Sequence, residues 1–79
     1  MNKYYVYAIK SLKDSRIYVG ISTQPIKRLK EHNNGKVKST QFYRPWKLIY
    51  KKYIGDRKIA RTKEKKLKSG YGKEFLKNL

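Results

Sequence analysis

The sequence predicts an α+β fold in which a small three-stranded antiparallel sheet is flanked by helices. Two Tyr- and Val-rich segments lie close together near the start of the chain, a third strand-like segment comes later, and helix-type patterns fill the rest. With 79 residues, of which 38% are hydrophobic, the chain can build only one thin core. We therefore expect a single domain over residues 1–79.

The first two strands are expected at residues 4–10 and 16–21. The second of them places Ile17, Val19 and Ile21 on one face, and Tyr18 and Gly20 on the other, which is the period of a strand. The intervening residues are few enough for a hairpin loop, so the two strands should pair antiparallel. Residues 46–54, WKLIYKKYI, supply the third strand.

The first helix is expected to begin after Ser22 and Thr23, which can cap it, and to run to about Asn33. Its apolar arc consists only of Ile26 and Leu29. These few apolar positions predict a helix that covers little of the core.

Two more helices are expected in the last third of the chain. Asp56 can cap a helix over residues 57–69, and Gly70 would end it. A short final helix over residues 72–79 would pack its apolar residues, which are Phe75, Leu76 and Leu79.

The charge of the chain indicates a polyanionic partner. Twenty-two Lys and Arg residues against five Asp and Glu residues give a net charge of +17, for which nucleic acid is the natural match, although charge alone leaves a generic basic surface open. The absence of cysteine excludes disulfides, thiolate zinc sites and cysteine catalysis, and it fits the cytoplasm. No apolar run approaches the ~20 residues that span a bilayer, so we expect no membrane partner.

The few acidic residues restrict any metal site. Four of them have ordinary roles in turns, caps or surface ion pairs, namely Asp14, Glu31, Asp56 and Glu74. Glu64 differs, because it shares an inward helical stripe with Ala60, Leu67 and Tyr71. It could be a metal ligand or could form a buried ion pair with Lys63, and both readings stay open. This inventory allows one metal ion rather than two.

Arg28 and His32 stand one helical turn apart and share a face. Arginine suits phosphate because its planar fork donates two parallel hydrogen bonds. His32 could bond phosphate or move a proton, or it could be a solvated surface group. On the paired strands, Tyr7 and Tyr18 could face a phosphate that Gly20 leaves room for, or they could simply pack in the core.

Taken together, these residues resemble a known family. Tyr5-Val6-Tyr7 and Tyr18-Val19-Gly20 are similar to the two half-motifs that name the GIY-YIG nucleases, and Arg28, His32 and Glu64 follow in the family's order. The likeness covers nearly the whole chain. It looks closest to short stand-alone bacterial members related to the nuclease domain of the excision-repair incision subunit.

The resemblance implies a metal-dependent endonuclease that hydrolyses DNA, in repair or recombination, and leaves a 5′-phosphate and a 3′-hydroxyl. It makes Glu64 the ligand of one metal ion, with magnesium the default and manganese a substitute. Tyr18 would be the general base and Tyr7 would position the water or the phosphate. Arg28 would stabilise charge on the phosphorane, and His32 would assist at the neighbouring phosphate.

The chain departs from the family pattern at three positions. The first half-motif reads Tyr-Val-Tyr, which keeps Tyr7; Ile21 stands where some repair nucleases carry lysine; and Asn78 lies too near the end to count as a catalytic asparagine. A tyrosine base also needs help, because the unperturbed tyrosine pKa is about 10. Proximity to a metal ion or to Arg28 would have to lower it.

Two other readings stay open. A non-catalytic module could keep the fold and bind DNA or structured RNA through Lys38, Arg44, Lys47 and the basic second helix, and a protein-interaction module could bind an acidic protein. Phosphate contacts carry no sequence information, so we expect weak sequence preference, with branched DNA, damaged DNA and RNA all open as substrates. The expected state is a monomer or a weak dimer.

Overall fold

A central strand organises the molecule. The computed structural model describes residues 3–79, in which β1 (Tyr4–Ser11) lies between β2 (Ile17–Ser22) and β3 (Trp46–Gly55). Both neighbours run antiparallel to β1, so the order in the sheet is β2-β1-β3. The prediction of an α+β fold with a three-stranded antiparallel sheet is confirmed.

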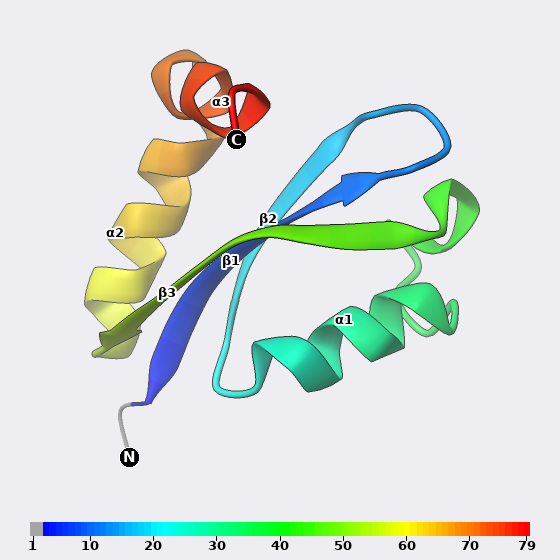
Figure 1. Ribbon diagram of the computed structural model, residues 1–79. Coiled ribbons are helices and arrows are strands. Elements are labelled where there is room, and N and C mark those ends of the chain that lie inside the picture. The colour runs from blue at the N-terminus through cyan, green and yellow to red at the C-terminus, as the bar shows by residue number, and fades with distance from the viewer. Residues whose placement is uncertain (1–2) are drawn as a thin grey trace.

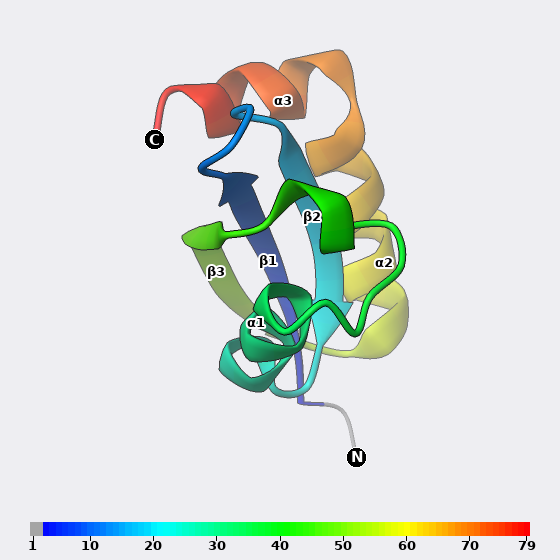
Figure 2. The same cartoon turned by 90° about the vertical axis from the view of Figure 1, so that its right-hand side faces the viewer.

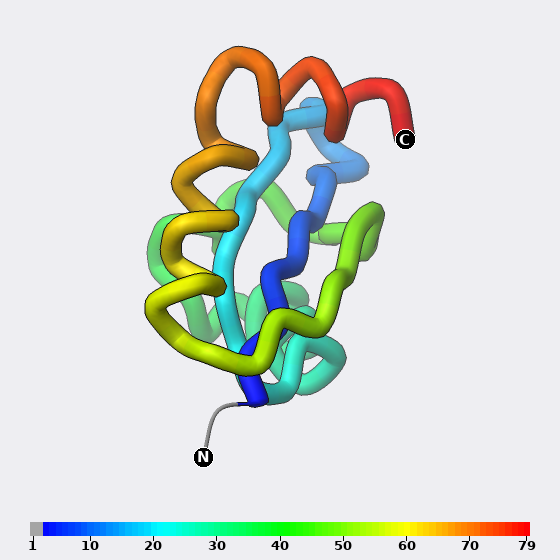
Figure 3. Tube along the Cα trace, turned by 90° about the vertical axis from the view of Figure 1, so that its left-hand side faces the viewer, coloured from blue at the N-terminus to red at the C-terminus, as the bar shows by residue number. Residues whose placement is uncertain are grey.

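Helices cover the two faces of this sheet unequally. Figures 1 and 2 show α1 (Pro25–Asn33) against one face, and α2 (Arg57–Lys68) with α3 (Gly70–Lys77) against the other. Because side chains alternate along a strand, β1 serves both faces. Val6 and Ala8 join the core under α2, whereas Tyr7 and Ile9 face the α1 side with Trp46. The tube in Figure 3 shows α2 running along the β2 side of the sheet.

The start and the packing of α1 differ from the prediction. Gln24 rather than Ser22 or Thr23 occupies the capping position, because Ser22 accepts a hydrogen bond from the Gln24 N–H and so forms the turn before the helix. Ile26 is 47% exposed, whereas His32 is fully buried. His32 points inward because its ring contacts the buried Tyr7 hydroxyl, whereas Leu29 of the same helix packs with the apolar residues of this face.

The break between the last two helices also falls elsewhere than predicted. Asp56 caps α2 as expected by accepting from the Ile59 N–H, but α2 ends at Lys68. Ser69 then caps α3, so Gly70 opens the third helix instead of ending the second. Gly72 lies so close to the Lys66 and Leu67 backbone that a Cβ atom would overlap it.

This break turns the apolar residues of α3 away from their expected positions. Tyr71 does not continue the inward stripe of α2, and its side chain is 90% exposed. Leu76 is buried as predicted, and Phe75 packs edge-on against Tyr50 of β3 with ring centroids 5.8 Å apart, whereas Leu79 is 59% exposed. In residues 3–79 no helix combines the length and the apolarity needed to cross a bilayer.

Candidate active site

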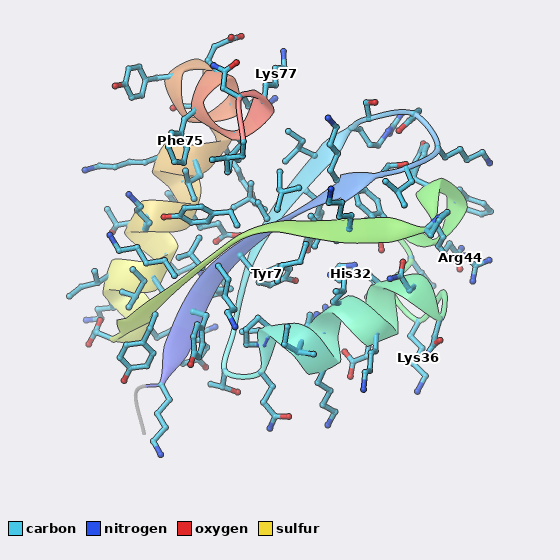
Figure 4. All side chains as sticks on the ribbon, viewed as in Figure 1. Tyr7, His32, Lys36, Arg44, Phe75 and Lys77 are labelled. Atoms are coloured by element: carbon cyan, nitrogen blue, oxygen red, sulfur yellow. The ribbon has the colours of Figure 1, made fainter. Side chains whose placement is uncertain are left out.

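Two strands and a helix bring a tyrosine and the single histidine into contact. The Tyr7 hydroxyl on β1 lies 2.9 Å from Nε2 of His32 on α1, and both side chains are buried. Tyr18 on β2 packs edge-on against the His32 ring, with centroids 4.9 Å apart. Figure 4 shows Tyr7 and His32 in the layer between the sheet and α1. The reading of His32 as a solvated surface group is therefore wrong.

The hairpin register explains why Tyr7 fits. Gly20 lies directly opposite Tyr7 in the β1–β2 ladder. A Cβ atom at residue 20 would lie only 2.8 Å from the Tyr7 hydroxyl oxygen, so the missing side chain is what lets the phenol lie across β2. The glycine of the second half-motif thus makes room for the tyrosine of the first half-motif.

Sequence reasoning missed Thr40, which completes this cluster. Its hydroxyl oxygen lies 2.8 Å from Nδ1 of His32 and 3.3 Å from the Val37 carbonyl oxygen, and the residue is buried. The indole N–H of Trp46 donates to the Thr40 carbonyl at 3.0 Å. A threonine in the polar segment KVKST carries no sequence signal for burial, because only the fold of the loop directs it inward.

Arg28 lies beside the buried pair. Its guanidinium donates to Glu31 at 2.8 Å, and Arg28 is close enough to Tyr7 for each to shift the pKa of the other. Burial raises the pKa of Tyr7 to about 12, and Tyr18 and Glu64 add to the rise, whereas Arg28 opposes it. Burial lowers the pKa of His32 to about 4, and the charge of Arg28 contributes to the decrease. The histidine is therefore neutral at neutral pH, and Arg28 carries the positive charge next to it.

Glu64 approaches from the other face of the sheet. Its side chain is 6% exposed, as the inward stripe predicted, but its partners are Arg61 at 3.3 Å and Lys68 at 3.1 Å rather than Lys63. Its negative charge contributes a little to the raised pKa of Tyr7, and the helix that carries it, α2, lies along edge strand β2 (Figure 3). A pocket of about 260 Å³ opens at this edge, lined by Ile17, Tyr18, Val19, Leu67, Lys68 and Lys73.

The donor set limits how a metal ion could bind. Among residues 3–79 no three His, Cys, Asp or Glu side chains cluster as a metal cage. Glu64 alone suits a hard divalent cation that keeps water and substrate oxygens as its other ligands. Arg61 and Lys68 are about half exposed, so they can turn into solvent and release the Glu64 oxygens.

Comparison with known proteins agrees with this arrangement. The GIY-YIG catalytic domain family matches residues 3–78. The chain belongs to the GIY-YIG family. A UPF0213 protein of Staphylococcus haemolyticus is 35% identical over 78 residues, which cover 98% of this chain and 94% of that protein. A UPF0213 protein of Clostridium perfringens is 38% identical over 61 residues, covering 76% of this chain and 64% of that protein. No solved structure matches significantly.

Three basic residues that were predicted to bind nucleic acid lie outside the cluster formed by Tyr7, Tyr18, His32 and Thr40. Lys38, Arg44 and Lys47 are exposed, and Figure 4 shows Arg44 beyond the C-terminal end of α1, near Lys36. Lys47 lies on β3, in register with Lys10. They can reach a long polyanion but do not contact Tyr7 or His32.

Asn78 lies at the C-terminal end of α3. Its side chain donates to the Glu74 carbonyl at the end of α3. In this position the amide serves the helix terminus.

Proposed function

We propose that this GIY-YIG protein is an endonuclease that hydrolyses DNA phosphodiester bonds with one divalent metal ion, magnesium or manganese. A single domain over residues 1–79 would carry the whole reaction, in the cytoplasm, as part of repair or recombination. The family supplies the reaction class, and the net charge of +17 supplies affinity for a polyanion.

One observation carries the proposal. The nearly buried carboxylate of Glu64 pairs with Lys68 at 3.1 Å, and Lys68 lines the same edge pocket as Tyr18. A fold that needed only packing would have no use for a carboxylate in this place, since burying a carboxylate is costly. A nuclease needs a metal ligand close to its general base.

The roles follow from these positions. The oxygen of Tyr7 would hold the attacking water, and Tyr18, half-buried beside the edge pocket, would take the proton of that water as the general base. Water oxygen bonds to phosphorus as the P–O3′ bond breaks. The 3′-oxygen takes a proton from solvent, which leaves a 3′-hydroxyl and a 5′-phosphate.

Positive charge at the site would serve the transition state. Arg28 would donate to the phosphoryl oxygens as negative charge develops on them, and His32 would assist at the neighbouring phosphate through its hold on Tyr7. When bound at Glu64, the metal ion would act as a Lewis acid on the phosphate. Exposed Lys38, Arg44 and Lys47 would contact more distant phosphates of the same duplex.

The test is cleavage of end-labelled linear, flapped and branched DNA by the wild type and by Glu64→Gln, with magnesium, with manganese and with chelator. Glu74→Gln is the matched control, because Glu74 forms an exposed ion pair with Lys77 on α3. Metal-dependent products from the wild type and the control, absent with Glu64→Gln, are expected. Cleavage assays with RNA substrates would decide between DNA and RNA. Sedimentation of the free protein would decide whether it is a monomer or a dimer.

The alternative is a non-catalytic module that keeps the fold and binds DNA or structured RNA. The observation in its favour is that both Glu64 oxygens already have partners, Arg61 and Lys68. This module would bind with a steep salt dependence, and chelator would not affect the binding. Retained binding without any cleavage in either metal would replace the endonuclease proposal with this one.

A further inference from the structure

Three buried side chains form a continuous hydrogen-bonded chain. Tyr7 contacts Nε2 of His32 at 2.9 Å, and Nδ1 of His32 contacts the Thr40 hydroxyl at 2.8 Å. The Thr40 hydroxyl continues to the Val37 carbonyl at 3.3 Å. Each of the three residues is at most 1% exposed, so bulk solvent does not compete for these bonds.

Counting protons gives the chain a direction. A neutral imidazole carries one N–H, and a hydroxyl has one proton to donate. The Val37 carbonyl can only accept, so the Thr40 hydroxyl donates to it, His32 donates from Nδ1 to Thr40, and Tyr7 donates to Nε2. In the opposite direction the Tyr7 proton would have no acceptor among the described residues, because Arg28, its other neighbour, only donates.

We propose that Thr40 is a positioning residue that holds His32 in the Nδ1–H tautomer, so that Nε2 accepts the Tyr7 proton. As a statement about catalysis, this rests on the proposed nuclease function. The hydrogen bond at one ring nitrogen decides which tautomer an imidazole adopts. With its proton directed at His32, Tyr7 presents oxygen lone pairs to the site and accepts a hydrogen bond from the attacking water, whose own lone pair is then free to face phosphorus.

The loop holds Thr40 in place through its backbone. Its carbonyl accepts from the Trp46 indole at 3.0 Å and from the Tyr43 N–H at 3.1 Å, and its own N–H donates to the Val37 carbonyl at 3.1 Å. Trp46 is itself buried. A residue fixed at both backbone groups presents its hydroxyl with little freedom, as a positioning role requires.

Without the Thr40 hydroxyl the imidazole would revert to the Nε2–H tautomer, which a histidine side chain favours in water. Nε2 would then donate to Tyr7, and the Tyr7 proton would turn outward into the site. Tyr7 would then donate a hydrogen bond to the attacking water, and this bond would use the lone pair that should face phosphorus. A measurement of stability or packing would not detect this change, because the positions of the rings do not change.

Nitrogen-15 spectroscopy tests the proposal directly. His32 is the only histidine in the chain, so long-range ¹H–¹⁵N correlation spectra of labelled protein contain one imidazole and need no assignment. The wild type and Thr40→Ser should show a protonated Nδ1 and a bare Nε2. Thr40→Val, which keeps the shape but lacks the hydroxyl, should move the proton to Nε2. A wild-type spectrum with protonated Nε2, or an unchanged Thr40→Val spectrum, would overturn the proposal.

Cleavage rates give the second readout. Thr40→Val should lower the rate of DNA cleavage about tenfold to a hundredfold at unchanged binding, and Thr40→Ser should restore it. Thr62→Val is the control, because Thr62 bonds only its own helix at the Lys58 carbonyl. Equal losses with Ser and Val at residue 40 would count against a tautomer role. If the wild type cleaves no DNA, the nuclease proposal fails, but the spectra still decide which tautomer His32 adopts. If Thr40→Val does not fold, the spectra of the wild type and of Thr40→Ser decide it.

Discussion

The Tyr7 hydroxyl lies against Gly20 of the paired strand. A Cβ atom at residue 20 would be only 2.8 Å from the hydroxyl oxygen. The phenol ring cannot retreat easily, because its side chain is buried and hydrogen-bonded to His32. The position of Tyr7 therefore depends on the absence of a side chain on the neighbouring strand.

Gly20→Ala should push Tyr7 away from His32. We expect a loss of about 1–3 kcal/mol in the free energy of unfolding from overpacking. DNA cleavage should fall about 10²-fold, because a small displacement of a positioning group is costly. Urea unfolding and single-turnover cleavage measure the two effects. Gly70→Ala is the control, since no atom lies within 4 Å of a Cβ placed there; equal behaviour of the two variants would contradict the argument.

Tyr18→Phe tests the general base. It should reduce cleavage by at least about 10²-fold and leave DNA affinity unchanged, because only a hydroxyl at the edge pocket is removed. Affinity would be measured in chelator, by fluorescence anisotropy of labelled DNA. Tyr71→Phe serves as the comparison, because Tyr71 lies on α3 and is 90% exposed. Near-normal turnover by Tyr18→Phe would remove Tyr18 from proton transfer.

Arg28→Lys keeps the positive charge but loses the planar guanidinium, which can donate two parallel hydrogen bonds. A lysine amine cannot contact Glu31, Tyr7 and a phosphate with the same geometry, so the cleavage rate should fall about 10²-fold while the salt dependence of binding is unchanged. Stopped-flow cleavage and salt titrations of binding check this. Lys30→Arg on the same helix is the control, and a fully active Arg28→Lys would mean that charge alone suffices.

Acid should destabilise the protein through His32. Its pKa is about 4 when folded and about 6.5 when unfolded, so the unfolded state binds more protons between these values. The stabilisation is therefore complete above pH 6.5 and is lost as the pH falls toward 4, by about 3 kcal/mol in all. Urea unfolding from pH 7 to 5 measures it.

His32→Gln provides the reference for that pH series. This variant should show a flatter dependence between pH 7 and 5. The pKa values of Asp14 and Glu31 are also lowered by their arginine partners, but carboxyls titrate below about pH 4.5 and so contribute outside this window. Parallel curves for the wild type and His32→Gln would show that another group is responsible.

Asn33→Ala should weaken the join between α1 and β3. The Asn33 amide accepts from the Trp46 N–H at 2.6 Å and donates to the Trp46 carbonyl at 3.1 Å. Losing both bonds leaves backbone groups of a buried residue unpaired, at a cost of about 1–3 kcal/mol. Thermal and urea unfolding measure the loss, and Asn34→Ala, one residue on and exposed, should change stability much less.

The strands were the most predictable part of the fold, because their alternation repeats every two residues. The end of α2 could not be predicted in this way. Ser69 caps α3 instead of continuing α2, and this depends on how closely Gly72 can approach the Lys66 backbone. That capping arrangement turns Tyr71 outward. Local patterns do not contain this tertiary contact.

The candidate site divides in the same way. The resemblance to the family pointed to Tyr7, Tyr18 and His32, and their contacts now give that set a geometry. Thr40 could not be predicted, because its role depends on a loop that brings a residue eight positions along the chain back onto the histidine. The partners of Glu64 were equally hidden, since Arg61 and Lys68 differ from the other basic residues of α2 only by side-chain direction.

The central place of β1 has a consequence during synthesis. The ribosome makes this strand before either of its partners, and β3, which pairs with it along Tyr4–Ser11, is separated from it by more than thirty residues. A hairpin of β1 and β2 can form early, but its second edge stays open until Trp46–Gly55 has emerged. A nascent chain stalled in that interval would expose the strand that carries Tyr7, and would be a substrate for chaperones before it could bind any nucleic acid.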